Sequence, residues 1–422
     1  MIKLLFDPKS RNFQRLWWAQ LVSQFGDRIN QLALVGLIAE RVPGSAMELA
    51  KLLAFTIIPV FLIQPFAGVF VDRWDRRATL LICDVIRGAL VLTIPFVFLA
   101  GGSMVPIYII VFLMFCFSRF YSPAKMSIIP DLVEKESLLM ANTLVSTTGM
   151  IAFVLGCALG GFLVDRYGAR NGFIIDGVTF LVSAALVFSI DLSLALQMHK
   201  SKILTVSKEI IGPIRRSVWS ELGEGLRYLA RTRELRLIIV MISAILAAAG
   251  AVYVVIIVFI QESFGSVTRD LGVLAVCLGV GLFLGAVLYG RWGKRLVWYR
   301  TMFWSLFTGG ALLTAFALVV HFEPRLTAAM VLAFALGVVT GPMFITANTI
   351  IHVVSDEKMR GKVFSALEIV IHLAFLAAML VSSWLAEFIP KGWILAGVGM
   401  ICAAIGVLGL RMKSSLAVLS TE

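Results

Sequence analysis

The chain is a succession of long apolar stretches separated by short polar ones. Twelve stretches of about 18 to 25 residues are nearly free of charge. A helix of roughly 20 residues is about 30 Å long, which matches the hydrocarbon thickness of a bilayer. Only a helix satisfies its own backbone hydrogen bonds in lipid at this segment length, so we expect an all-α integral membrane protein. The expected spans are residues 17–39, 50–71, 78–100, 105–122, 141–163, 172–192, 236–260, 271–290, 299–320, 326–347, 362–386 and 393–411.

A long polar interruption divides the spans into six and six, which predicts two pseudo-symmetric six-helix halves. We expect an N-terminal bundle over residues 1–192, a linker over 193–235 and a C-terminal bundle over 236–422. In the linker, residues 220–231 carry leucines at helical spacing, which is typical of an amphipathic helix on a membrane surface. A plain tether between the halves explains this stretch equally well.

The two halves also show a weak internal repeat. The segments that begin at Pro123 and Pro342 each close the fourth span of their half, and a short polar run comes next in both cases. Both pairs of matching positions, 123 with 342 and 136 with 355, are separated by the same offset of 219 residues. Internal repeats of this kind are a common way to build secondary transporters.

Composition and charge agree with a membrane protein and orient it. The chain is 60% hydrophobic and 15% charged, with a mean hydropathy of +0.95 and a net charge of +12. The N-terminus and the even-numbered connections hold 27 Lys and Arg residues, against 7 in the odd-numbered connections. Positive residues stay on the cytoplasmic side, so we expect both termini and the linker to be cytoplasmic. The basic charge therefore reports topology and contact with anionic lipids rather than nucleic-acid binding.

A short charged loop follows the second span. Residues 68–77, here named the charged loop, place five charges in their last six positions. The matching stretch of the second half, residues 285–295, has Tyr289 where the first half has Asp72. We expect Asp72 to hold the cytoplasmic side closed through the dipole or the arginines of a helix in the second half. The gating residues of the loop are then Gly68, Asp72, Arg73, Arg76 and Arg77.

The charged loop resembles the loop motif of the major facilitator superfamily, Gly-x-x-x-Asp-Arg-x-x-Arg-Arg/Lys, and the resemblance extends over the entire chain. Within that superfamily the chain looks most like the macrolide-efflux branch of drug:proton antiporters. The segments that carry this likeness are Phe25-Gly26-Asp27, the run from Pro123 to Val133, Asp176 to Phe180, Glu224 to Tyr228, and Arg360 to Val363. The resemblance implies the major facilitator fold, a small-molecule substrate and no enzymatic activity.

Two further elements resemble superfamily motifs with a departure in each. The fifth span carries Gly156, Gly160 and Gly161, as in the antiporter motif, but Cys157 stands in the place of its proline. Glycines four residues apart let a neighbouring helix approach closely, so plain helix packing explains them as well as an antiport role. Arg119 resembles the arginine of the fourth span, although the glycine that usually follows it is missing.

Ionisable residues inside spans are expensive in lipid and are functional candidates. Asp27 lies ten residues into the first span, ~15 Å deep and near the midplane where substrate sites of this class lie. Arg28, Asn30 and Gln31 follow it. Asp27 is a candidate proton carrier, because desolvation favours a neutral carboxyl group. A structural ion pair with Arg28 or with an arginine of another helix is the alternative.

Two other pairs of ionisable residues lie inside spans. Glu368 and His372 are four residues apart in the eleventh span, so they share a helix face as a proton relay or as a packing pair. Asp84 and Arg87 lie three apart in the third span, and we expect them to be partners of the charged loop. The other histidines in or near spans, His321 and His352, lie at span ends and are expected to be uninvolved.

No motif points to a cofactor. The five cysteines fall in apolar spans as small buried hydrophobes, and no metal-ligand spacing or nucleotide-binding loop occurs in the sequence. We therefore expect a monomeric exporter of amphipathic or hydrophobic small molecules, driven by protons in the cell membrane. A lipid or siderophore transporter of the same fold without firm proton coupling is the alternative. A membrane enzyme or sensor is more remote, because no polar segment is long enough for a catalytic domain.

Overall fold

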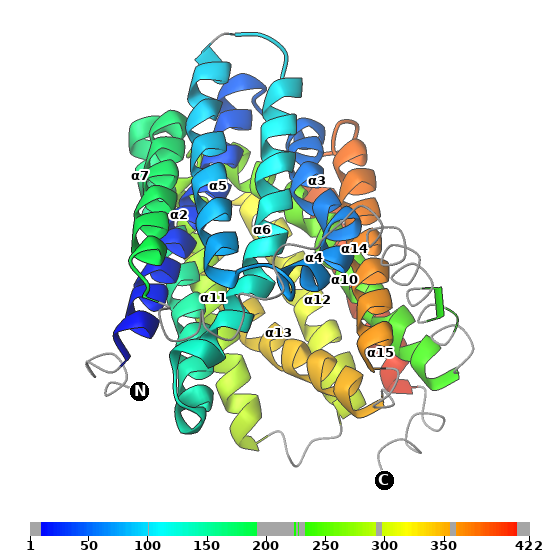
Figure 1. Ribbon diagram of the computed structural model, residues 1–422. Coiled ribbons are helices and arrows are strands. Elements are labelled where there is room, and N and C mark those ends of the chain that lie inside the picture. Colours follow the sequence, from blue (N-terminus) through cyan, green and yellow to red (C-terminus); the bar gives the residue numbers. More distant parts are fainter. Residues whose placement is uncertain are drawn as a thin grey trace. The chain divides into compact units, whose positions relative to one another are not determined.

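The fold is built from long helices, shown in the computed structural model of Figure 1. The structure describes residues 10–99, 101–191, 223–224, 227, 233–292, 298–354 and 360–411. The helices of the first part are α2 (Arg11–Arg41), α3 (Ala46–Leu62), α4 (Gln64–Val71), α5 (Arg76–Leu99), α6 (Val105–Leu132) and α7 (Leu138–Phe188), with a 3-10 turn at Lys135–Ser137. Those of the second part are α10 (Arg233–Phe264), α11 (Arg269–Trp292), α12 (Trp298–Phe322), α13 (Leu326–Val354), α14 (Arg360–Leu385) and α15 (Lys391–Arg411).

The helices account for the twelve expected spans. Within the described residues, nine helical segments are long and apolar enough to cross a membrane, or ten if α3 and α4 together form one bent span. Helix α7 contains both the fifth and the sixth expected span. Helix α2 contains the first span, whose polar residues lower its hydropathy. The protein is therefore an all-helical, multi-pass membrane protein.

Three helices differ in their ends from the expected spans. The second span bends by 52° at the break between α3 and α4. Helices α6 and α13 continue to Leu132 and Val354, beyond residues 122 and 347 where we expected the fourth and tenth spans to end, and Pro123 and Pro342 lie inside them. Proline is tolerated inside membrane helices, because neighbouring helices and local adjustments satisfy the backbone groups that it frees.

The expected loop between the fifth and sixth spans is reduced to a single break. Gly168 has φ 81° and ψ 161° inside α7, and the residues on both sides are helical. Backbone angles of this kind are open to glycine at no steric cost and are strained for other residues. The two spans are therefore joined as arms of one helical hairpin.

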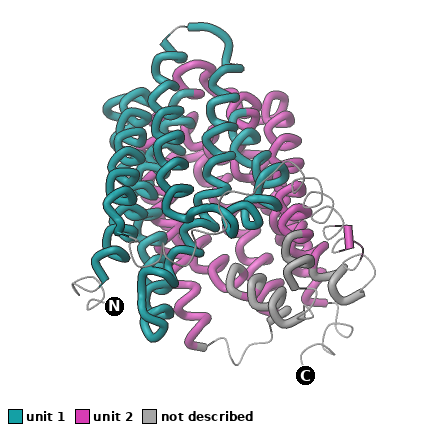
Figure 2. Tube along the Cα trace, viewed as in Figure 1, with its two compact units in different colours: residues 1–37, 52–221 teal, residues 38–51, 222–422 magenta. Residues whose placement is uncertain are grey.

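The chain forms two compact units, coloured separately in Figure 2. Unit 1 comprises residues 1–37 and 52–221, and unit 2 comprises residues 38–51 and 222–422. The division at residues 221 and 222 lies inside the expected linker, but the assignment of 38–51 to unit 2 has no counterpart in the expected domains. The amphipathic helix expected at 220–231 lies almost wholly outside the described residues; 223, 224 and 227 are helical.

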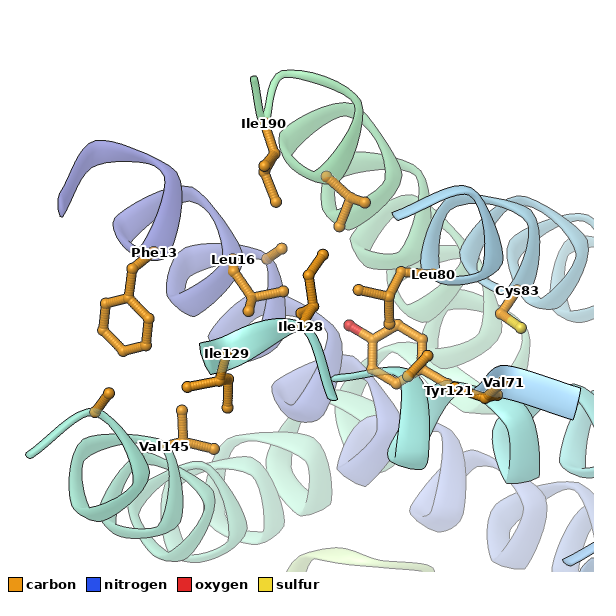
Figure 3. Packing of buried hydrophobic residues seen from close by; sticks show 14 of the residues in the cluster. Phe13, Leu16, Val71, Leu80, Cys83, Tyr121, Ile128, Ile129, Val145 and Ile190 are labelled. Atoms are coloured by element: carbon orange, nitrogen blue, oxygen red, sulfur yellow. The ribbon is translucent and has the colours of Figure 1, made fainter. Parts of the chain in front are cut away.

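Each unit has its own packing. In unit 1, α5 packs against α6 and α7, and α4 packs against α6. A buried apolar cluster there collects residues from five helices, among them Leu16 of α2, Val71 of α4, Leu80 of α5 and Val145 of α7 (Figure 3). In unit 2, α10 packs against α14, α11 against α13 and α12 against α15.

Candidate functional site

The polar face of α2 is the centre of the candidate site in unit 1. Gln20, Gln24, Asp27 and Gln31 follow one another at spacings of four, three and four, so they lie on one face of the helix. Asp27 is half-buried. No hydrogen bond or ion pair of its carboxylate occurs within the described residues. A half-buried carboxylate without such a partner is free to bind a proton or a ligand.

Helix α2 is held close to both arms of α7. A Cβ atom at Gly26 would overlap with the side chains of Thr179 and Asp176 in the second arm. In the first arm, a Cβ atom at Gly156 would lie 2.6 Å from the Cβ of Arg28, and one at Gly160 would lie 3.2 Å from the Cα of Ile29. Small residues on both helices thus bring the polar face of α2 into a fixed register with α7.

The glycine motif of the fifth span therefore faces α2 and packs against it. Cys157 is buried, like Cys83 and Cys402, and it is a free thiol. The geometry explains the glycines by close packing. It leaves an antiport-specific role for Gly156, Cys157, Gly160 and Gly161 as a prediction.

Asn30 ties α2 to a buried acid of α7. Its Nδ2 atom donates a hydrogen bond of 2.7 Å to Oδ2 of Asp176 and lies 3.3 Å from the sulfur of Met114. The hydroxyl of Thr179 donates a 2.7 Å hydrogen bond to the backbone carbonyl of Asp176 and lies 3.3 Å from Oδ1 of the same residue. Asp176 is fully buried, and Asn30 is the clear donor to its carboxylate.

A buried ion pair lies beside this contact. Arg87 and Asp84 of α5 form a salt bridge at 3% and 0% exposure, and Ser183 of α7 donates a 2.7 Å hydrogen bond to Asp84. The Arg87 guanidinium stacks between the rings of Tyr121 and Phe180, at 4.3 Å from each centroid. Figure 3 shows Tyr121 beside Leu80 of the apolar cluster.

The expectation that Asp84 and Arg87 are partners of the charged loop is wrong. Within the described residues they are paired with each other, and their other hydrogen bonds and ring contacts are to the carbonyl of Cys83, Ser183, Tyr121 and Phe180. The physical reason is that this face of α5 points toward α6 and α7, where the ions find polar and aromatic partners that offset desolvation.

Three cations act electrostatically on Asp27: Arg87, Arg28 and Lys125. None of them forms an ion pair with it. Arg28 donates a 2.8 Å hydrogen bond to Oε1 of Gln31 and stacks over the ring of Phe153, 5.0 Å from its centroid. The alternative interpretation of Asp27, a structural pair with Arg28, is therefore not what the structure contains.

Lys125 of α6 was not among the residues predicted for the site. Its side chain is half-buried, and Asp27 is the anion that acts on it. No hydrogen bond or ion pair of its ammonium group occurs within the described part of the chain. The sequence places Lys125 next to Pro123, which made it look like part of a loop rather than of a helix.

The charged loop is attached to its own unit. Arg76 forms a 2.5 Å salt bridge with Asp131 and donates a 2.9 Å hydrogen bond to the carbonyl of Ser127. Arg77 donates to the carbonyl groups of Val187 and Phe188 at the end of α7. These bonds connect the loop to the ends of α6 and α7.

Two other residues of the loop, Asp72 and Arg73, lack such attachments. Asp72 is exposed, and its backbone N–H donates a 3.0 Å hydrogen bond to the carbonyl of Gly68. Its carboxylate makes no hydrogen bond or ion pair within the described residues, and neither does the side chain of Arg73. The role of Asp72 in closing the cytoplasmic side remains a prediction.

The matching loop of unit 2 is described only in part. The hydroxyl of Tyr289 accepts a 3.2 Å hydrogen bond from Thr346 of α13, so the residue in the place of Asp72 belongs to a contact between two helices. Residues 293–297 lie outside the described residues.

Glu368 and His372 of α14 contact each other. The Nδ1 atom of His372 lies 3.3 Å from Oε2 of Glu368 and 2.7 Å from its carbonyl oxygen. The side chain of Glu368 is 44% exposed and that of His372 is 34% exposed. The geometry allows proton exchange between them and equally allows a static contact, so the two alternatives stay open.

Arg119 lies elsewhere on α6. Its guanidinium is 3.4 Å from Oε1 of Gln64 at the start of α4. The structure does not bring it into contact with Asp27.

Two cavities are lined by described residues of unit 2. One of about 430 Å³ lies where α10, α12 and α15 end or begin; Glu262 and Lys391 form a 2.8 Å salt bridge in its wall, and His321 also lines it. The second, of about 570 Å³, has an almost entirely apolar lining from α10, α12, α14 and α15. Among the described residues, no group of three His, Cys, Asp or Glu side chains is placed to hold a metal ion.

Comparison with known proteins identifies relatives along the full chain. The uncharacterized MFS-type transporter YfiS of Bacillus subtilis (strain 168) is 24% identical over 430 residues, covering 98% of this chain and 95% of the relative. The proposed bacilysin exporter BacE of Bacillus amyloliquefaciens is 28% identical over 304 residues, covering 69% and 70%.

Solved structures show the same fold at low identity. A bacterial homologue of the iron transporter ferroportin, in an inward-facing state, matches with a TM-score of 0.72 at 15% identity, over 95% of this chain and 99% of that chain. An auto-inhibited POT family peptide transporter matches with a TM-score of 0.69 at 13% identity, over 96% and 97%.

The family model of the Major Facilitator Superfamily matches residues 16–322 and 237–416, which together cover most of the sequence. The chain is thus a transporter rather than an enzyme, and it belongs to the Major Facilitator Superfamily.

Proposed function

We propose that this protein is a secondary active exporter of amphipathic or hydrophobic small molecules, driven by proton antiport. Family membership supports a transporter, and the relatives named as exporters support the direction. The excess of Lys and Arg in alternate connections supports a place in the cell membrane with both termini in the cytoplasm. Alternating access of two six-helix halves around a midplane site is the mode of transport that this fold uses.

The observation that carries the proton-coupled part is the state of Asp27. It is the half-buried acid of α2 whose carboxylate makes no hydrogen bond or ion pair within the described residues. Asp84, an acid of the same region, is paired with Arg87 and bonded to Ser183, and Asp176 accepts from Asn30. Asp27 can take up or release a proton without breaking a hydrogen bond or an ion pair within the described residues.

The proposed cycle alternates two states of Asp27. Ionised Asp27 attracts a cationic or polar part of the substrate, and the nearby positive charges of Arg87 and Arg28 limit its cost in the membrane. A proton that arrives from outside neutralises the carboxylate and weakens its attraction for the substrate. Release of the substrate outside and of the proton inside then follows from the change in access.

The test is efflux of a cationic dye, ethidium, from proteoliposomes that contain the full-length protein. We expect wild type to move the dye when a pH gradient is imposed and to stop when the gradient is collapsed. Asp27→Asn should abolish the dependence on the gradient, because an amide cannot exchange the proton.

Glu368→Gln serves as the matched comparison. If the Glu368–His372 contact carries the proton, this variant shifts the pH optimum of efflux and Asp27→Asn does not. Normal, gradient-dependent efflux in Asp27→Asn would show that the assignment of the proton to Asp27 is wrong. Efflux that ignores the gradient in wild type would contradict proton coupling altogether.

A further inference from the structure

The charged side chains around the polar face of α2 are of two kinds: those whose charged group has a hydrogen bond or ion pair, here called committed, and those without one within the described residues, here called uncommitted. Of the acids, Asp84 and Asp176 are fully buried; Asp84 is bonded to Arg87 and Ser183, and Asp176 accepts a hydrogen bond from Asn30. Asp27 is half-buried, and its carboxylate has no hydrogen bond or ion pair within the described residues. One acid of three is therefore uncommitted.

The cations divide in the same way. Arg87 is paired with Asp84 and enclosed by two aromatic rings. Arg28 is bonded to Gln31 and stacked on Phe153. Lys125 is the one cation of this region whose charged group makes neither kind of contact within the described residues. One cation of three is likewise uncommitted.

The two uncommitted charges belong together electrostatically. Asp27 is the anion that acts on Lys125, and Lys125 is one of three cations that act on Asp27. They do not lie close enough to form an ion pair. Charged groups away from bulk water are costly unless something compensates them. Both side chains are half-buried, so each still borders open space. An unpaired carboxylate and an unpaired ammonium group are together complementary to a molecule that carries both charges.

We infer that Asp27 and Lys125 bind the two charged ends of a zwitterionic substrate, with its ammonium group at Asp27 and its carboxylate at Lys125. This assignment rests on the proposed transport function and specifies the class of its substrate. A simple cation would leave Lys125 uncompensated, and a simple anion would leave Asp27 uncompensated. A zwitterion compensates both and adds no net charge to the site.

Polar atoms near Asp27 fit an ammonium group. Oε1 of Gln24 and Oδ1 of Asn30 are buried and have no hydrogen-bond partner within the described residues. They lie about one helical turn before and after Asp27 on α2. An ammonium group brings three N–H donors, so acceptors beyond one carboxylate are useful to it.

The arrangement also links binding to the proton. Protonation of Asp27 would remove the partner of the ammonium group, and Lys125 would then hold only the carboxylate. The charged groups that act on Asp27, or on which it acts, are Arg28 on its own helix, Arg87 and Asp84 on α5, Lys125 on α6, and Asp176 on α7. Of these, Lys125 alone is both charged and uncommitted, so it is the group whose pairing changes.

Binding of four matched probes to the purified full-length protein tests the inference. The probes are leucyl-phenylalanine, its N-acetyl derivative, its C-terminal amide and the doubly blocked N-acetyl amide, which are a zwitterion, an anion, a cation and a neutral molecule of nearly one shape. Binding is followed by the rise in Tm and by competition between probes. We expect the zwitterion to bind about 10- to 100-fold more tightly than the doubly blocked probe, as charge-assisted hydrogen bonds provide.

The variants assign each end. Asp27→Asn should remove the tighter binding of probes with a free ammonium group. Lys125→Gln should remove the tighter binding of probes with a free carboxylate, and Lys125→Arg should retain it. Lys51→Gln and Glu323→Gln, which alter exposed ion pairs, should leave the order of the four probes unchanged.

Two results would overturn the inference. One is an equal response of wild type to all four probes, including no response at millimolar concentration. The other is an equal loss of all four probes in both variants. The order in which the wild-type protein binds the four probes decides the inference by itself, even if a variant fails to fold. If wild type still drives dye efflux with a pH gradient, only the substrate class is wrong. If probes are selected but no gradient-driven efflux occurs, the proposed function fails instead.

Discussion

The two units are stabilised by different interactions. Unit 1 buries the ions Asp84, Arg87 and Asp176 and compensates them with hydrogen bonds and aromatic rings. Unit 2 buries Asp270 near the start of α11, and its other buried polar groups within the described residues are hydroxyls of serine and threonine. The charged chemistry of the described bundle cores is therefore concentrated in one half.

Both units contain close glycine contacts, but those between α11 and α13 of unit 2 bring backbone against backbone, whereas Gly26 and Gly156 of unit 1 mainly face side chains. A Cβ atom at Gly281 or Gly285 of α11 would meet backbone atoms of α13 at 3.0 Å or less, and one at Gly337 or Gly341 of α13 would meet backbone atoms of α11. Glycines four residues apart on both helices thus face each other. Such a crossing gains dispersion contacts without burying any charge.

The difference suggests that the two units have different roles in transport. A half with buried, compensated ions can respond to protons and charged ligands, because each change of charge alters its pairing. A half held by glycine contacts offers shape and rigidity but little response to charge. Three experiments test this comparison, in order of expected effect.

The largest effect is expected from breaking the buried ion pair of unit 1. Asp84→Ala leaves Arg87 buried without its partner, which typically costs about 3–5 kcal/mol of unfolding free energy. The measurement is unfolding of the purified protein by titration with SDS. Replacing both residues with leucine should recover most of the loss, because no orphan charge remains.

A matched control for this prediction lies in unit 2. The hydroxyl of Ser383 is buried and has no hydrogen-bond partner within the described residues. Ser383→Ala should therefore change stability by less than about 1 kcal/mol. A loss for Asp84→Ala no larger than that of Ser383→Ala would mean that the ion pair is not a stabilising element of unit 1.

A smaller effect is expected from the glycine crossing of unit 2. Gly281→Val would force α11 and α13 apart, because the new side chain meets backbone atoms rather than a flexible side chain. Overpacking of this kind costs about 1–3 kcal/mol. Unfolding in SDS gives the value.

Gly290→Ala in the same helix is the control, since nothing lies within 4 Å of the added atom. Alanine favours a helix over glycine by up to about 1 kcal/mol, so the control should be neutral or stabilising. If Gly281→Val and Gly290→Ala raised the unfolding free energy equally, α11 and α13 would not be closely packed at Gly281.

The smallest effect is expected at the charged loop. Arg76 and Asp131 are about one third exposed, so water screens their salt bridge and Arg76→Ala should cost about 1 kcal/mol or less. Arg76→Lys should retain part of it, and Lys51→Ala, which breaks an exposed pair in unit 2, should cost no more. A loss comparable with that of Asp84→Ala would place the loop among the main stabilising contacts of unit 1.

The sequence predicts the helical fold well because lipid leaves few alternatives. Runs of apolar residues at membrane length predicted the helices, and the charged loop pointed to the superfamily that the family model confirms. Span ends were less predictable. Proline usually marks a helix boundary, but α6 continues through Pro123, and this hid Lys125 from the prediction.

The candidate site was predictable only one residue at a time. Asp27 stood out because a charge in an apolar span is costly. Which ion pairs with which is a matter of three dimensions: the i, i+3 spacing of Asp84 and Arg87 allowed a pair, but Ser183 lies 99 residues away from Asp84. Asp176 appeared only as part of a motif, and its contact with Asn30 joins residues 146 positions apart.

The break at Gly168 has a mechanical consequence for α2. The two arms of α7 meet at one residue, without a loop between them. Helix α2 contacts both arms, at Gly156 in one and at Asp176 in the other. A displacement of α2 along its axis would have to shear both contacts at once. We therefore expect α2 and both arms of α7 to move as one rigid body, so that a movement of α2 caused by a change of charge at Asp27 displaces the whole hairpin.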